Sequence, residues 1–188
     1  MICLGEYPEA VTWSDRALER FANTPDLLAA KGLALVYLKD GEGPGYLDGA
    51  VEMRWPSAWV WLARGESLLA TRQPETNAYR CFLKAIELAP GDWHTTLRIG
   101  IAYNRHHLPA KARPHLLAAL RTAKDNPLLL YQLGLTHEGL GDYPGAAGYY
   151  ERALVARPRF PEARDAVYRL NHISPLSRLW RQLRHGRG

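Results

Sequence analysis

The sequence predicts an all-α protein built as a short array of antiparallel helix pairs. The segment Gly5–Pro8, Gly-Glu-Tyr-Pro, returns as Gly-Asp-Tyr-Pro at Gly141–Pro144, an offset of 136 residues or four times 34. A glycine recurs at nearly the same period, at Gly32, Gly65, Gly100 and Gly134. Self-similarity at a fixed period of about 20 to 50 residues is the signature of repeat architectures. Hydrophobic residues make up 47% and charged residues 23% of the 188 residues, which is typical of a folded chain rather than a disordered one.

Three segments carry the same residue types at corresponding positions. The segment 127–160 has Leu130, Leu133, Gly134, Ala146, Tyr150, Ala153 and Pro158. The segment 93–126 has Ile99, Gly100, Tyr103, Ala112, Leu116 and Ala119, and the segment 58–92 has Trp61, Gly65, Leu68, Ala78, Phe82, Ala85 and Pro90. This pattern resembles the tetratricopeptide repeat family. The resemblance implies a right-handed superhelical array of antiparallel helix pairs with a concave inner surface.

The ends of the array depart from this pattern. Residues 25–57 form a degenerate repeat, because Pro44 falls where an alanine is expected and the Gly41–Gly45 cluster predicts a short second helix over 46–54. Residues 1–24 supply only the second helix of an incomplete first repeat, predicted at Tyr7–Arg20. Residues 161–173 are expected to form a capping helix, and residues 174–188 a basic amphipathic tail.

Glycine and alanine residues predict where the two helices of a pair approach each other. Helix axes approach where both helices carry small side chains, so Gly134 is expected to face Ala146, while Leu133 and Tyr150 fill the seam. A bulky residue at Gly134 or Ala146 is then expected to cost a few kcal/mol by overpacking.

The resemblance places five positions of each first helix on the concave groove. Lysine, asparagine and arginine clamps, which some family members use for a peptide carboxylate, are absent, because leucine or isoleucine stands at those positions. The groove is therefore predicted to bind a peptide or amphipathic helix of another protein. The candidate contacts are Trp59, Leu62, Leu69, Leu97, Ile101, Asn104, Arg105, Tyr131, Leu135 and Glu138.

The tail has an apolar stripe at helical spacing, formed by Leu176, Leu179, Trp180 and Leu183. Three interpretations compete for it: a second cap packed on the last repeat, a basic helix on an anionic membrane surface, and an arm that grips an acidic protein or nucleic acid. The candidate tail contacts are Arg178, Trp180, Arg181 and Arg184.

Charge, cysteine usage and hydropathy limit which ligands and which cellular compartment the sequence indicates. The net charge is +5, and without the four arginines of the tail it falls to +1, so a nucleic-acid-binding body is not indicated. Cys3 and Cys81 lack metal-site spacing and fit a reducing compartment. No apolar run reaches the roughly 18 to 20 residues that span a bilayer, and the start does not read as a secretory signal. We therefore expect a cytoplasmic protein if Met1 is the native start.

No residue pattern indicates catalysis, a cofactor or a metal. The histidines at 94, 106, 107, 115 and 137 show no His-Glu-x-x-His spacing, and no acidic partner is expected beside them. The Gly41–Gly45 cluster has no preceding strand and no following lysine with Ser or Thr, so it is not a phosphate-binding loop.

Two functional classes remain. The first is an interaction module, an adaptor, scaffold or assembly factor. The second is an accessory domain that recruits substrate for a larger, enzymatic polypeptide. The uncovered edge of the first helix, around Ile2, Leu4, Val11 and Trp13, indicates either a missing upstream segment or a surface for docking and self-association.

Overall fold

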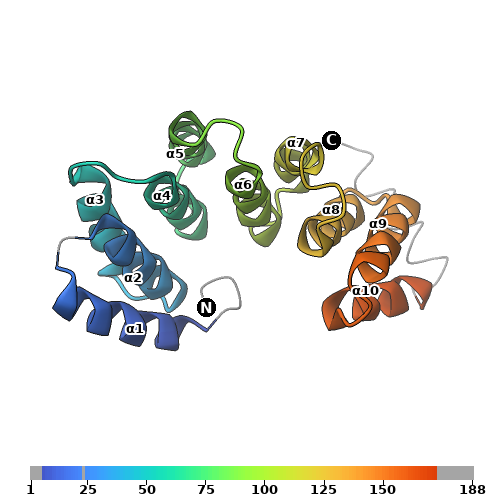
Figure 1. The fold of residues 1–188 in the computed structure, drawn as a ribbon, viewed down its shortest axis with the longest axis horizontal. Helices are drawn as coiled ribbons and strands as arrows, with labels where there is room; N and C mark the ends of the chain where they lie inside the picture. Colours follow the sequence, from blue (N-terminus) through green and yellow to red (C-terminus); the bar gives the residue numbers. More distant parts are fainter. Residues whose placement is uncertain (1–5, 23, 173–188) are drawn as a thin grey trace. The chain divides into compact units, whose positions relative to one another are not determined.

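Ten α-helices form in the part of the chain that the computed structural model describes, residues 6–22 and 24–172. No strand occurs in these ranges, so the predicted all-α fold of helix pairs is confirmed (Figure 1). The helices are α1 (Tyr7–Arg20), α2 (Pro25–Tyr37), α3 (Gly43–Glu52), α4 (Ala58–Ala70), α5 (Glu75–Leu88), α6 (Trp93–Arg105), α7 (Pro109–Leu120), α8 (Pro127–Gly139), α9 (Tyr143–Ala156) and α10 (Pro161–Asn171).

Local sequence explains where most helices begin. Proline occupies one of the first two positions of seven helices: α1, α2, α3, α7, α8, α9 and α10. Proline is tolerated there because the N–H groups of the first turn have no partner within the helix. Asn126 and Asp142 add side-chain caps, each accepting a 3.0 Å hydrogen bond from a backbone N–H three residues later.

The first turn of α3 corrects one expectation. The second helix of residues 25–57 begins at Gly43 rather than at Tyr46, and it ends at Glu52 rather than at Arg54. Pro44 lies in the first turn, where it interrupts no helical hydrogen bond. By contrast, α1 covers Tyr7–Arg20 as expected.

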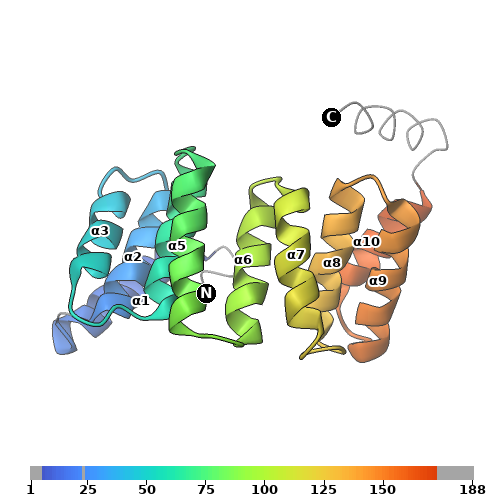
Figure 2. The same cartoon turned by 90° about the horizontal axis from the view of Figure 1, so that it is seen from above.

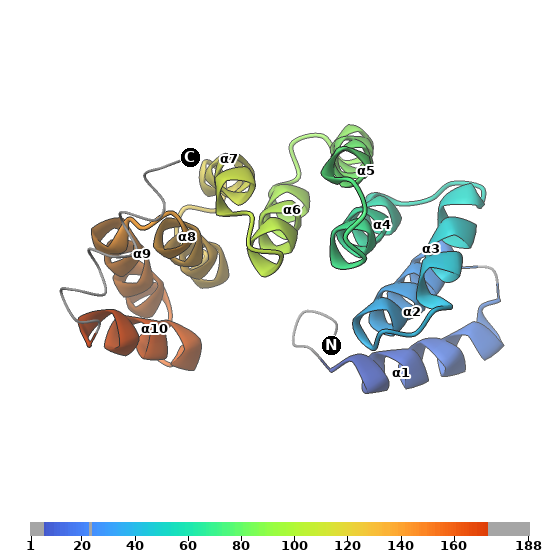
Figure 3. The same cartoon turned by 180° about the vertical axis from the view of Figure 1, so that it is seen from behind.

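The helices group into two compact units, Met1–Thr95 and Thr96–Gly188. In the first unit α2 pairs with α3 and α4 with α5, α1 packs on α2, and both α2 and α3 contact α4 (Figure 2). In the second unit α8 pairs with α9, α7 contacts α8, and α10 packs on α9 (Figure 3).

A glycine of each first helix sits against its second helix. The expectation that Gly134 faces Ala146 is wrong, because a Cβ at Gly134 would overlap the ring of Tyr150. The same relation holds in two other pairs, where Gly65 faces Phe82 and Gly100 faces Leu116. The glycine thus makes room for a large side chain rather than for a second small residue.

Gly141 forms the turn that joins α8 to α9 in the Gly-Asp-Tyr-Pro segment of residues 141–144. Its φ of 81° is a left-handed conformation that glycine adopts without strain. Its N–H donates to the carbonyl of Glu138 (3.0 Å), and the N–H of Asp142 donates to that of His137 (2.9 Å), which is the hydrogen-bond pattern of a Schellman motif. The motif therefore ends α8 and caps α9 within four residues.

Each unit has its own core. In the first unit one buried cluster joins α2, α3 and α4 through Ala29, Leu33, Val36, Leu47, Ala50, Val60 and Ala63. In the second unit one cluster contains Tyr143, Ala146, Tyr150, Ala166 and Leu170, and another contains Leu130, Ala153, Phe160 and Ala163. Helix α10, the last helix of the described residues, contributes to both of these clusters.

Candidate functional site on the first helices

The sequence-predicted contacts of the first unit lie on α4, and two of the three are buried. Leu62 is 5% exposed and Leu69 is 9% exposed, so their side chains belong to the core. Trp59 is partly exposed and packs against the cluster formed by α2, α3 and α4. Of these three residues, only Trp59 offers surface to a partner.

On α6, Leu97 is also buried, at 5% exposed, whereas Ile101 and Arg105 are partly exposed. The sequence pattern placed all three on one helical face but could not show how deeply each one sits. Leucine at such a position stabilises the array by packing and presents no accessible surface.

The face of α8 carries an apolar stripe at Leu128, Tyr131 and Leu135, spaced i, i+3 and i+7. Leu128 is 42% exposed, whereas Tyr131 and Leu135 pack in part against the core next to α10. The ring of Tyr131 lies 5.6 Å from that of Tyr150 and 5.3 Å from that of Phe160, and burial raises the pKa of its hydroxyl. The stripe therefore runs from an exposed leucine into a well-packed aromatic cluster.

Asn104 holds α6 to α8. Its Nδ2 donates to the backbone carbonyl and to Oε1 of Gln132, at 2.9 and 3.0 Å, and its Oδ1 lies 2.9 Å from the hydroxyl of Thr136. Gln132 is 9% exposed and Thr136 is fully buried, so these bonds join polar groups in the core. The amide predicted to contact a partner is thus engaged within the protein.

Glu138 joins three helices of the second unit. Its Oε2 accepts hydrogen bonds from the Tyr150 hydroxyl of α9 and from Nη2 of Arg169 on α10, both at 2.8 Å. Its side chain is only 16% exposed. Burial, followed by the charge of Glu138, raises the pKa of Tyr150, and the bond to Glu138 raises the pKa of Arg169. Sequence reasoning missed this cluster because its partners lie 12 and 31 positions from Glu138.

Two histidines have acidic neighbours, contrary to expectation. Nδ1 of His94 lies 3.3 Å from Oδ1 of Asp92, and Nδ1 of His137 lies 2.7 Å from Oδ2 of Asp142. The bond from His137 and the bond from the backbone N–H of Gly145 lower the pKa of Asp142. Both aspartates also accept bonds from backbone N–H groups at helix starts, so the contacts belong to capping structures.

Within residues 6–22 and 24–172, no group of three or more His, Cys, Asp or Glu side chains could hold a metal ion. Over the same residues, no helix has the length and apolar character needed to cross a membrane. The predicted tail contacts at positions 178, 180, 181 and 184, and the edge residues Ile2 and Leu4, lie outside the described residues.

A family model described as tetratricopeptide repeat matches residues 97–163. Among solved structures, the chain is similar to TTC0263, a thermophilic tetratricopeptide-repeat protein of Thermus thermophilus, with a TM-score of 0.76 at 21% identity over 92% of this chain and 94% of the other. It is also similar to YrrB, a tetratricopeptide-repeat protein described as having an unusual peptide-binding site, with a TM-score of 0.58 at 18% identity over 87% of this chain and 84% of YrrB.

A chain of the Cut9–Hcn1 hetero-tetramer of the APC/C is similar with a TM-score of 0.67 at 18% identity, over 97% of this chain and 36% of that one. At such identities these similarities concern the fold. Among curated proteins, no sequence matches this chain.

Proposed function

Because the chain has the tetratricopeptide-repeat fold, which serves in general as a protein–protein interaction module, we propose that its second unit binds a peptide or amphipathic helix of another protein along the face of α8. The observation that carries the proposal is Leu128. This leucine is 42% exposed at the open end of a stripe whose other members, Tyr131 and Leu135, are held in place by the core. An exposed apolar side chain beside a fixed aromatic ring suits the apolar face of a partner helix.

Rigidity of the surrounding scaffold supports the same proposal. Asn104, Gln132 and Thr136 fix α6 against α8, and Glu138 fixes α8 against α9 and α10. A surface that is already ordered loses little conformational entropy when a partner binds. Ile101 of α6 and the Leu128 stripe of α8 are the side chains that we expect a partner to contact.

A matched pair of variants tests this proposal. Leu128→Glu places a charge on the α8 stripe, whereas Val155→Glu places the same charge on α9 at an apolar residue that is 83% exposed. Neither change alters a buried side chain, so both proteins should keep their helical circular dichroism and melting temperature. We expect a partner captured from lysate of the source cells by the native chain and by Val155→Glu to be lost with Leu128→Glu. Equal capture by both variants would contradict the proposal.

A further inference from the structure

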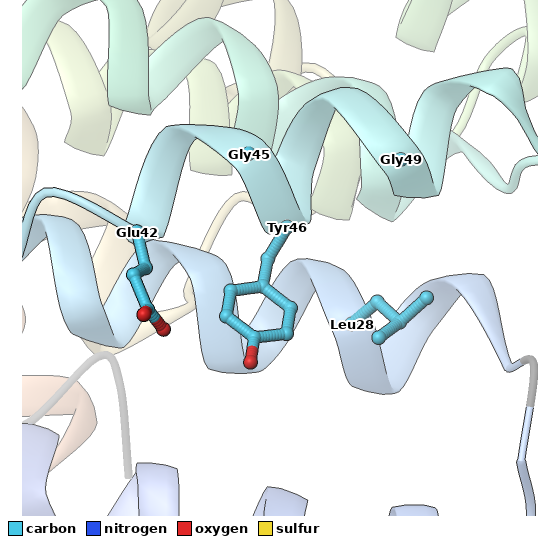
Figure 4. Close-up of a pocket in the computed structure, with 5 residues that line it drawn as sticks. All are labelled: Leu28, Glu42, Gly45, Tyr46 and Gly49. Carbon is cyan, nitrogen blue, oxygen red and sulfur yellow. The ribbon is translucent and has the colours of Figure 1, made fainter.

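A second surface, unrelated to the α8 stripe, lies on the first unit. A pocket of about 430 Å³ opens on α2 and α3 and is lined by Leu28, Glu42, Gly45, Tyr46 and Gly49 (Figure 4). A Cβ added at Gly45 or at Gly49 would meet no atom within 4 Å. The glycines of α3 therefore leave open space beside an apolar residue of α2, and no described side chain fills it.

One wall of the pocket is held in place. Nζ of Lys31 lies 3.0 Å from the hydroxyl of Tyr46, 2.7 Å from Oδ1 of Asp15, and 4.4 Å from the centre of the Tyr46 ring. The bonds to Asp15 and Tyr46 raise the pKa of Lys31, so it stays a cation. These contacts tie α1, α2 and α3 together and fix the orientation of the ring that lines the pocket.

The rim of the pocket is acidic. Among the described residues, no basic side chain pairs with the Glu42 carboxylate, which Figure 4 shows on the same side of α3 as the Tyr46 ring. Glu42 is the one charged residue that lines the pocket. The sequence range that contains the lining residues, 6–57, has nine acidic and five basic side chains, a net charge of −4. The remainder of the chain is therefore +9, against +5 for the whole. The pocket thus lies in an acidic part of the sequence of a basic protein, and its exposed carboxylate and apolar lining suit a basic, apolar occupant.

The chain itself contains a segment of this chemistry. Residues 174–188 combine the stripe Leu176, Leu179, Trp180 and Leu183 with four arginines and no acid. We propose that this segment of a second copy of the chain docks in the pocket of α2 and α3, with Trp180 in the pocket and the arginines directed toward Glu42. Tryptophan is the largest side chain of the stripe, and an open pocket of about 430 Å³ has room for an aromatic ring against the Tyr46 and Leu28 side chains. Apolar burial then supplies affinity, and the opposite charges supply orientation.

Photo-crosslinking in the full-length chain tests the proposal. A benzophenone amino acid replaces Leu179, the chain is irradiated, and the adducts are mapped by mass spectrometry. We expect the crosslinks to fall on residues 27–54, which include all the residues that line the pocket. Mixing heavy-isotope and normal chains then shows which copy supplies the tail. Adducts between two copies support the docking, and adducts found within one copy alone would overturn it.

Two glycines provide a matched control. Gly49→Leu fills the pocket, whereas Gly148→Leu places the same side chain on α9, at another helical glycine whose added Cβ would meet no atom within 4 Å. We expect Gly49→Leu to reduce the crosslink yield at least about fivefold and Gly148→Leu to leave it unchanged. Circular dichroism confirms that both variants remain folded.

Charge provides an independent measurement that does not depend on filling the pocket. Glu42→Lys removes the unpaired rim carboxylate, and we expect it to lower the yield and to weaken the dependence of the yield on salt. Crosslinks that map to α9 or α10 would overturn the proposal in favour of a second cap. Transfer of the crosslink to added anionic vesicles, with none on residues 27–54, would overturn it in favour of a membrane contact. An unchanged yield in both Gly49→Leu and Glu42→Lys would overturn it as well.

Discussion

The pairs α2/α3 and α8/α9 close in different ways, although both set a glycine of the first helix against the second helix. Gly134 of α8 accommodates the ring of Tyr150, which is fully buried. Gly32 of α2 instead meets the backbone carbonyl of Gly43 and the side chains of Tyr46 and Leu47. One glycine makes room for a side chain, and the other makes room for a neighbouring backbone.

The difference affects what each pair can present to other molecules. In α8/α9 the ring that fills the seam also donates a hydrogen bond to Glu138, which in turn holds α10. In α2/α3 the helices approach through glycines, and the exposed side of α3 is left with Gly45 and Gly49 beside an open pocket. A degenerate repeat thus keeps the pair but replaces a filled surface with an accessible one.

The largest expected change in stability tests the contact between Gly32 and the backbone carbonyl of Gly43. Gly32→Ala places a methyl group 2.8 Å from the carbonyl oxygen of Gly43, which cannot move unless α3 moves. We expect a loss of about 2 to 3 kcal/mol in the free energy of unfolding, measured by urea denaturation. A loss below about 0.5 kcal/mol would show that the seam of α2 and α3 relaxes without cost.

The equivalent change in the other pair should cost less, and its cost should depend on Tyr150. Gly134→Ala forces the Tyr150 ring aside, for an expected loss of about 1 to 2 kcal/mol in the same assay. Because the obstacle is a side chain, Gly134→Ala should cost less in a Tyr150→Ala background than in the native chain. A double-mutant cycle with no coupling between the two positions would contradict the assigned contact.

The ends of the two first helices predict a smaller effect of opposite sign. Gly141 follows α8 with a φ of 81°, whereas Lys39 follows α2 in the same left-handed region, with a φ of 61°. A side chain is strained there and glycine is not, so Lys39→Gly should stabilise the chain by about 0.5 to 1 kcal/mol. Lys111→Gly, at an exposed position inside α7, is the control that should destabilise it, because glycine is a poor helix former. Equal loss from both changes would contradict the assigned turn.

The smallest expected effect is the part of the stability at low pH that depends on Asp142. The bond from His137 lowers the pKa of Asp142 from its usual 3.8, so the folded state holds this proton less tightly than the unfolded state. The associated stability is present above pH 3.8 and is lost as the pH falls through the lowered pKa. Asp142→Asn should therefore flatten the acid limb of the stability curve relative to that of the native chain. The comparison is made by urea unfolding between about pH 5 and about pH 2.

The helix pairs and their period could be predicted from the sequence, because both depend on residue types, such as the spaced glycines, that recur at regular intervals. It did not identify what each glycine faces. Ala146 and Tyr150 are both in α9 within a few residues of each other, and only the rotation of that helix decides which one meets Gly134. The start of α3 was misplaced because Pro44 was interpreted as a helix breaker rather than as a residue of the first turn.

The candidate site was predicted less completely than the fold, for a similar reason. A family pattern assigns residues to a face, but depth depends on the neighbouring helix, and Leu62, Leu69 and Leu97 prove to be buried. The polar bonds of Asn104 and Glu138 join residues 12 to 32 positions apart, and no local pattern marks them. The pocket of α2 and α3 was not predicted, because its lining combines Leu28 of α2 with residues 42–49, and no local pattern shows that these segments lie together.

The hydrogen bonds that Asn104 and Glu138 make within the protein bear on how selectively the proposed α8 stripe would choose between partners. These two side chains would be the natural readers of a partner's backbone or charge, and both already bond to neighbouring helices. A ligand that engaged them would have to replace bonds that hold the helices together. What remains for recognition is the contour of an apolar stripe, which discriminates poorly between side chains of similar size. Such a face would tolerate substitutions in its ligand and accept several related helices.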